Sequence, residues 1–293
     1  MAASDPTDDG GENARDGPRD DSRDPTGDGS AGGGSDVPIR PLLDDARESL
    51  RVERRRLVDE REAFESFRRR VRGIAAGSET TAPTPHRLRA RPTGRRLVAV
   101  RDSYRETVMA VPHYETEYND TYERSLAAEF GPEIATVLTR GTSLHERYRS
   151  VLLTKTDEAI RQRGSLLEAV ERESTSVSNA ADRLLPTLDE IEETSATDLA
   201  DEPFGTLDAY RARLGVLGER CAEVSTRRQR HRDDGERALA LDETLPDVQT
   251  YLYQDLPVTY PVLSAVARLL VRISGVRRDI EREMMDGGPA IGE

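Results

Sequence analysis

Apolar residues recur every seven positions between residues 41 and 72, which is typical of a helix that packs against another helix. A second row of positions beside these residues completes the seam and holds the apolar Ala46 and Phe67. Two glutamates, Glu53 and Glu60, interrupt this second row. The spacing predicts a coiled-coil helix over residues 39–73, and it leaves open whether the rest of the chain, a second copy or a partner protein covers the seam. The repeating residues are Leu43, Leu50, Leu57, Phe64 and Val71.

Helical spacing resumes in short segments between residues 97 and 141. Pro112 disfavours a helical conformation at the residue before it, so the first of these helices is expected to stop there. Asp120 stands three residues before Glu123, a spacing that can cap a new helix. The stretch "HYETEYND", residues 113–120, is therefore predicted to connect two helices.

Two longer apolar stripes follow, one over residues 144–184 and one over residues 207–224. Two long helices joined by a short turn form an antiparallel hairpin. Pro186 is expected to kink or end the first of these helices, because it lacks the backbone N–H that a helix interior needs. Beyond residue 224 the packing of the second helix should loosen, since its next seam positions are Arg228, His231 and Gly235.

The predicted fold class is all-α, because no segment alternates apolar and polar residues over a useful length. Residues 1–38 hold ten acids, eight glycines and almost nothing apolar, which predicts a disordered acidic tail. Residues 74–96, rich in Pro, Thr, Gly and Arg, are expected to form a flexible basic linker. A helical domain is predicted over residues 97–286, with its last helix over residues 260–285.

The composition favours long exposed helices over a thick core. Charged residues make up 34% of the chain, aromatic residues only 4%, and mean hydropathy is −0.70. The net charge is −13, and all but one of the 43 basic residues are arginine. A surface with many acids and almost no lysine is typical of a cytoplasm at very high salt, where carboxylates keep the protein hydrated. A GC-rich genome would also favour arginine over lysine.

The sequence indicates a cytoplasmic protein without a membrane span. The start "MAASDPTDDGG" has neither the basic nor the apolar run of a signal peptide. The longest uncharged stretch, "LPVTYPVLSAVA", is shorter than the ~20 residues that cross a bilayer. The single cysteine, Cys221, excludes an internal disulfide and a multi-cysteine metal site.

His113, Glu115 and Glu117 are the residues that most resemble a catalytic or metal site. In an extended segment they would share one side and could bind a metal or transfer protons, whereas in a helix they would scatter. The chain has no H-E-x-x-H motif and no histidine at the E-x-x-H spacing of di-iron bundles. A structured connector is the favoured interpretation, so no catalytic, cofactor-binding or metal residue is assigned and no cofactor is expected.

Seven of the nine tyrosines fall into two groups that are far apart in sequence. A tyrosine has an apolar ring and a hydroxyl that needs a partner, so both groups suit one packing layer of mixed polarity. We therefore expect the helices of residues 97–140 to pack against those of residues 245–285 at one end of the hairpin. A small-ligand pocket or an enzyme site in that layer is an alternative. The groups are Tyr104, Tyr114, Tyr118 and Tyr122, and Tyr251, Tyr253 and Tyr260.

Two basic clusters, "HRLRARPTGRR" within the arm 87–101 and "RRQRHR" at residues 227–232, raise the question of nucleic-acid binding. The second cluster runs directly into Asp233 and Asp234, and no aromatic residue interleaves with either cluster to stack on bases. Nucleic acid is therefore an unlikely partner. The favoured interpretation is that these arginines pair with acidic helices of their own chain.

The stretches "RDSYRETVMAVPHYETEY", "LAAEFGPEIA" and "YLYQDLPVTYPVL" resemble the signatures of an uncharacterised all-helical family of halophilic archaea, a domain of unknown function, over residues 97–275. The resemblance implies a haloarchaeal, mostly helical protein and brings no activity, cofactor or catalytic residue. The leading hypothesis is a non-catalytic interaction or scaffold protein that binds a protein partner, or a second copy, through its helices. The alternatives are a nucleic-acid-associated or regulatory protein using the basic arm 87–101, and an enzyme or small-ligand binder at the tyrosine layer.

Overall fold

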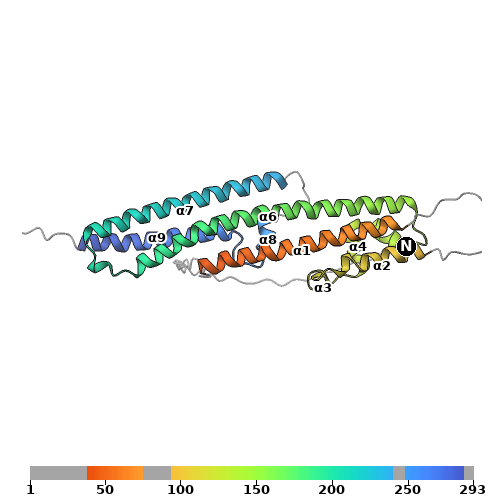
Figure 1. Cartoon of the computed structure of the whole chain (residues 1–293), viewed down its shortest axis with the longest axis horizontal. Helices are drawn as coiled ribbons and strands as arrows, with labels where there is room; N and C mark the ends of the chain where they lie inside the picture. Colours follow the sequence, from red (N-terminus) through yellow and green to blue (C-terminus); the bar gives the residue numbers. More distant parts are fainter. Residues whose placement is uncertain (1–37, 75–93, 240–247, 287–293) are drawn as a thin grey trace, which may run out of the picture. The chain divides into compact units, whose positions relative to one another are not determined.

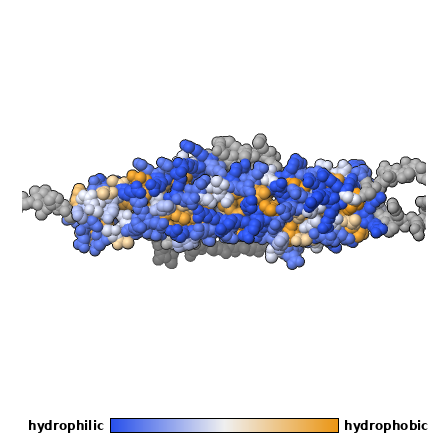
Figure 2. All heavy atoms as spheres, in the orientation of Figure 1, coloured by the Kyte–Doolittle hydropathy of each residue, from blue (hydrophilic) through white to orange (hydrophobic). Residues whose placement is uncertain are grey.

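A computed structural model describes residues 38–74, 94–239 and 248–286 (Figure 1). The expected acidic tail of residues 1–38 and the basic linker of residues 74–96 lie almost entirely outside this part. Within the described ranges every regular element is a helix, which confirms the all-α fold class. Figure 2 shows one face of the molecule, on which hydrophilic residues predominate and hydrophobic ones form separate patches.

Long helices alternate with groups of short ones along the chain. Single 3₁₀ turns stand at Val108–Ala110 and Leu199–Asp201. The helices are α1 (Ile39–Gly73), α2 (Arg95–Arg105), α3 (Tyr114–Glu117), α4 (Tyr122–Phe130), α5 (Pro132–Arg140), α6 (Glu146–Ala196), α7 (Phe204–Leu239), α8 (Val248–Leu252) and α9 (Pro261–Asp286).

The apolar seam of α1 is covered by α6, and the two helices run side by side over much of their length (Figure 1). The N-terminal part of the seam, including Leu43 and Leu50, shares a buried cluster with Val177 and Leu184 of α6. The C-terminal part, including Phe67, shares a second cluster with residues of α6 and of the short helices. The sequence left open whether the rest of the chain, a second copy or a partner protein covers this seam. In the structure a helix of the same chain, α6, covers it.

Ion pairs between α1 and α6 flank this seam and define the antiparallel direction. They connect arginines at heptad spacing on α1 to acids on α6 whose numbers fall as the arginine numbers rise. The pairs are Arg40–Asp189, Arg47–Asp182, Arg54–Glu171 and Arg68–Asp157. These arginines belong to neither of the two basic clusters for which pairing within the chain was expected. In the second of those clusters, Arg227 pairs with Glu223 and Arg228 with Glu173.

The second long stripe also packs as predicted. Leu214, Leu217 and Cys221 of α7 are buried, and α7 packs antiparallel to α6 and more extensively against α9. The apolar face expected for the last helix, from Val262 to Met284, is buried in α9 as far as Ile280 and partly buried at Met284.

α6 does not end at Pro186 but continues to Ala196. The neighbours of the proline, Leu184 and Leu188, are buried against other helices, and this packing stabilises the helix across the missing hydrogen bond.

The short helices α2, α4 and α5 form a separate aromatic cluster around the C-terminal half of α1. Phe67 and Phe130 stack on each other with ring centroids 6.0 Å apart, and Tyr104 meets both rings edge-on. The predicted cap of α4 was wrong by one residue. Thr121, not Asp120, accepts the hydrogen bond from the backbone of Arg124 at 3.3 Å, because the helix begins at residue 122.

Candidate functional site

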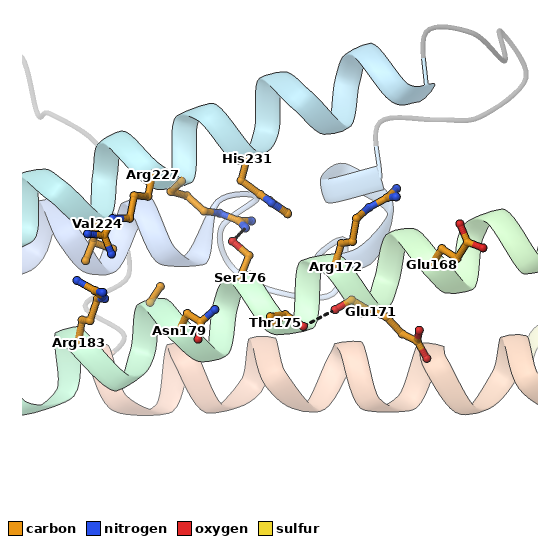
Figure 3. A pocket seen from close by; sticks show the side chains of 12 residues that line it. Glu168, Glu171, Arg172, Thr175, Ser176, Asn179, Arg183, Val224, Arg227 and His231 are labelled. Atoms are coloured by element: carbon orange, nitrogen blue, oxygen red, sulfur yellow. Dashed lines mark hydrogen bonds between the residues drawn. The ribbon is translucent and has the colours of Figure 1, made fainter.

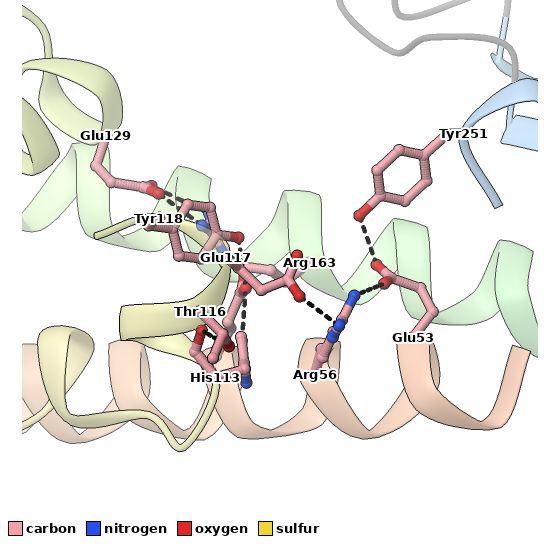
Figure 4. A network of polar contacts seen from close by, with 10 residues as sticks. Glu53, Arg56, His113, Thr116, Glu117, Tyr118, Glu129, Arg163 and Tyr251 are labelled. Carbon is pink, nitrogen blue, oxygen red and sulfur yellow. Dashed lines mark hydrogen bonds and ion pairs between the residues drawn. The ribbon is translucent and has the colours of Figure 1, made fainter. Parts of the chain in front are cut away.

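The carboxylate of Glu60 is the centre of a polar network inside the α1 seam. Only 9% of this residue is exposed. Its Oε1 accepts a hydrogen bond of 2.8 Å from the hydroxyl of Tyr118 and lies 3.1 Å from Nε2 of His113, while its Oε2 accepts one of 3.0 Å from Arg163 of α6. Arg163 also donates two hydrogen bonds, of 2.6 and 3.1 Å, to Glu129 of α4. The network therefore ties α1 and α6 to the short helices (Figure 4).

Glu53 continues this network one heptad earlier on α1 and is only 8% exposed. It accepts a 2.9 Å hydrogen bond from the hydroxyl of Tyr251 in α8, and Arg56 beside it pairs with Glu117 (Figure 4). Burial raises the pKa of Glu53 in spite of these partners. Burial and the neighbouring carboxylate also raise the pKa of Tyr251, so its hydroxyl remains the donor.

A second buried centre forms around Glu173 of α6, which is 3% exposed. Arg228 of α7, 4% exposed, makes a bidentate pair with it, Tyr253 donates a 2.6 Å hydrogen bond, and His231 lies 3.3 Å away. Burial alone would raise the pKa of Glu173, but these hydrogen bonds and the arginine charge outweigh it and lower the pKa to about 2. The carboxylate is therefore ionised at neutral pH and joins α6 and α7 to the residue that follows α8.

The expected common tyrosine layer is wrong. Tyr104 and Tyr122 belong to the aromatic cluster of the short helices, whereas Tyr253 belongs to the cluster shared by α6, α7 and α9. The hydroxyls of the exposed Tyr118 and the buried Tyr253 donate to separate carboxylates, those of Glu60 and Glu173. The hydroxyl of Tyr251 binds a third carboxylate, that of Glu53, and the hydroxyl of Tyr104 bonds to Ser125, so the tyrosine hydroxyls do not pair with one another.

The sequence-predicted candidates His113, Glu115 and Glu117 are not brought together. His113 faces Glu60, Glu117 pairs with Arg56 and Glu115 is exposed. The segment is helical from residue 114, which scatters the three side chains. Over residues 38–74, 94–239 and 248–286, no group of three His, Cys, Asp or Glu side chains is placed to hold a metal ion.

A groove of about 870 Å³ opens between α6 and α7, at the point where looser packing was predicted. Figure 3 shows side chains from both helices along it, including Arg172 and Ser176 of α6 and Arg227 and His231 of α7. The groove begins where the apolar seam of α7 gives way to charged residues, because guanidinium groups cannot pack as closely as leucines. The residues lining it are Glu168, Glu171, Arg172, Thr175, Ser176, Asn179, Ala180, Arg183, Val224, Arg227, Arg228 and His231.

Sequence reasoning missed the three acids at the centres of these networks as site residues, although their signal was present. Glu53 and Glu60 were visible as charges inside an apolar seam. Glu173 stands on the apolar stripe of α6, three residues after Val170 and four before Val177. A charged residue at a core position needs a buried partner, and that requirement was the available signal.

The fold and these networks define an all-helical protein whose long helices are joined through buried carboxylates. The chain belongs to the family of a domain of unknown function, DUF7260, whose model matches residues 41–277. This match includes α1, which the resemblance over residues 97–275 left out.

No curated protein and no solved structure matches the chain. In the ranges that the structure describes, no helix is long and apolar enough to cross a membrane.

Proposed function

We propose that this chain is a non-catalytic interaction protein that binds an acidic segment of a partner protein in the groove between α6 and α7. The observation that supports this proposal is a groove of about 870 Å³ with arginines on both walls. It replaces the seam of α1 as the candidate docking surface, because α6 already covers that seam.

The arginines at the rim of the groove are available to exchange partners. Arg183 and Arg227 share one exposed carboxylate, that of Glu223, at 4.0 and 3.4 Å. Exposed pairs of this kind contribute about 0–1 kcal/mol, so a partner's carboxylate can replace them at little cost. Arg172 is exposed and has no ion-pair partner among the described residues. Arg228 differs from these three, since it is buried on Glu173 and belongs to the fold.

The size of the groove fits a peptide segment. Its α6 wall runs over residues 168–183, which at 1.5 Å per residue is about 22 Å. That length accommodates about seven extended residues or about fifteen helical ones. None of the described residues that line it is Phe, Tyr or Trp, so this part of the groove offers no large aromatic ring on which the bases of a single-stranded nucleic acid could stack.

Binding of a defined acidic peptide tests the proposal. The probe is a fluorescein-labelled 15-residue peptide of Glu and Ala with Glu at every third or fourth position, and its matched control carries Gln in place of Glu. Fluorescence anisotropy should show saturable binding of the Glu peptide only. The Kd should rise between 0.1 and 1 M NaCl, because the Debye length falls from about 10 to 3 Å.

Two double variants of equal net charge locate the site. Arg172→Glu with Arg183→Glu reverses the groove wall and should weaken binding at least tenfold. Arg278→Glu with Arg282→Glu makes the same change on the exposed face of α9 and should leave the Kd within twofold of wild type. Equal binding of the Glu and Gln peptides, or an unchanged Kd in the groove variant, would overturn the proposal.

The basic arm 87–101 is the alternative binding surface, and its residues 87–93 lie outside the described part of the chain. A single-stranded oligonucleotide that binds equally well to both double variants, and that Arg87→Ala with Arg89→Ala releases, would favour the nucleic-acid alternative.

A further inference from the structure

A small cavity of about 70 Å³ lies next to the Glu60 network. Its walls come from α1, α4, α6 and the connector of residues 108–120. One water needs roughly 10–15 Å³ of such space, so the cavity has room for roughly five non-hydrogen atoms. It is therefore large enough for a small molecule and too small for a peptide.

The charges around this cavity are unbalanced. Three carboxylates line it, those of Glu60, Asp120 and Glu129, against the single guanidinium of Arg163. Arg163 binds Glu60 and Glu129. Asp120 has no ion-pair partner among the described residues. The lining thus carries a net charge of about −2 at neutral pH, which favours a cationic occupant.

A buried tyrosine supplies an independent sign of a ligand. Tyr114 is only 7% exposed, and its hydroxyl has no hydrogen-bond partner among the described residues. Burial raises the pKa of this phenol, the charges of Asp120 and Glu129 raise it further, and the side chain of Ser125 opposes them. All three line the cavity, so the hydroxyl faces into it. An unpaired buried hydroxyl is unfavourable, and a polar occupant would satisfy it.

The remaining walls suit an organic group. The rings of Tyr114 and Tyr118 lie 5.7 Å apart, and aromatic faces attract cations. Val108, Val111 and Ala128 add aliphatic surface on which a short alkyl chain can pack.

We propose that this cavity binds a small organic ammonium ion, with its charge on the carboxylates and its alkyl group against the tyrosine rings. The ammonium donates hydrogen bonds to Asp120 and Glu129, and the hydroxyl of Tyr114 joins the same cluster of polar groups. The site is independent of the groove between α6 and α7, so either one can exist without the other.

Propylammonium and 1-propanol are matched probes, because they have the same size and differ in charge. Ligand-observed NMR titration of the full chain should show saturable 1:1 binding of propylammonium and none of 1-propanol. Asp120→Asn should weaken propylammonium binding at least tenfold, and Tyr114→Phe about fivefold, which are the losses expected for a charged and a neutral hydrogen bond.

Tyr122→Phe is the matched control variant. Tyr122 is also buried with an unpartnered hydroxyl, but it does not line the cavity. Binding in this variant should equal that of wild type, and circular dichroism verifies that each variant is folded.

Three results would overturn the proposal. The first is the absence of saturable propylammonium binding, which would mean that the cavity holds water only. The second is equal binding of 1-propanol and propylammonium. The third is an equal loss of propylammonium affinity in Tyr114→Phe and Tyr122→Phe.

Discussion

Replacement of Glu173 by Gln tests how the buried carboxylates hold the helices together. The change keeps the shape of the side chain but leaves the buried guanidinium of Arg228 without its counter-charge. In the folded chain the pKa of Glu173 is about 2, against an ordinary value of 4.5. At 1.36 kcal/mol per pKa unit, this difference corresponds to about 3 kcal/mol of stability. Breaking a buried ion pair by removing one partner costs a similar ~3–5 kcal/mol.

The pH dependence gives this prediction a second readout. Because folding lowers the pKa of Glu173, the stabilisation is fully present above pH 4.5 and is lost as the pH falls towards 2. The gap in unfolding free energy between wild type and Glu173→Gln should thus be about 3 kcal/mol at pH 7 and should shrink between pH 4.5 and 2. Urea denaturation followed by circular dichroism at several pH values measures this gap.

Glu192→Gln is the matched control, because Glu192 also lies on α6 and pairs with an arginine, Arg272, but at the surface. Its loss should cost at most ~1 kcal/mol at pH 7. A gap below 1 kcal/mol for Glu173→Gln, or a gap that stays constant as the pH falls from 4.5 to 2, would refute the reasoning.

Three further changes have clear expected outcomes. Glu53→Gln should leave the unfolding free energy at pH 7 unchanged or raise it by up to ~1 kcal/mol. The reason is that burial raises the pKa of Glu53, while an amide oxygen can still accept the hydrogen bond from Tyr251. A clear loss of unfolding free energy in a urea titration would contradict this. Phe67→Ala should cost about 3–5 kcal/mol, seen as a lower midpoint in thermal denaturation, since Phe67 is fully buried; a cost under 1 kcal/mol would show that the cluster is loosely packed. Gly141→Ala should also lower the thermal midpoint, because a Cβ there would lie 2.3 Å from the backbone oxygen of Val137, and an unchanged midpoint would mean that the turn adjusts freely.

Apolar periodicity predicted the long helices of this chain well, because burial of one face decides both their position and their orientation. The stripe predicted over residues 207–224 and one face of the last helix are buried in α7 and α9, for example at Leu214 and Leu269. The same seam predicted where the packing of α7 loosens, because Arg228 and His231 are too polar to continue a leucine seam. The groove between α6 and α7 follows from that change.

The polar networks could not be predicted from the sequence, because their partners are far apart along the chain. Tyr253 and Glu173 are 80 residues apart, and Tyr251 and Glu53 are 198 apart. The apolar seams mark these glutamates as acids at core positions, but nothing local identifies the distant partner that each one needs. The tyrosine prediction failed for this reason. It placed both groups of tyrosines in one packing layer, whereas the hydroxyls of Tyr118, Tyr251 and Tyr253 donate to glutamates that are far away in the sequence.

The heptad seam between α1 and α6 has a repeat, and a repeat alone permits more than one alignment of the two helices. Sliding α1 by seven residues, about 10.5 Å, would still place apolar residues against apolar residues. The pair of Glu60 and Arg163 distinguishes these alignments, because Arg163 can neutralise the carboxylate of Glu60 at one alignment only. A slide of seven residues in one direction would place this buried carboxylate opposite Val170. That slide would leave an unpaired charge in the core, so this buried pair favours the native alignment over it.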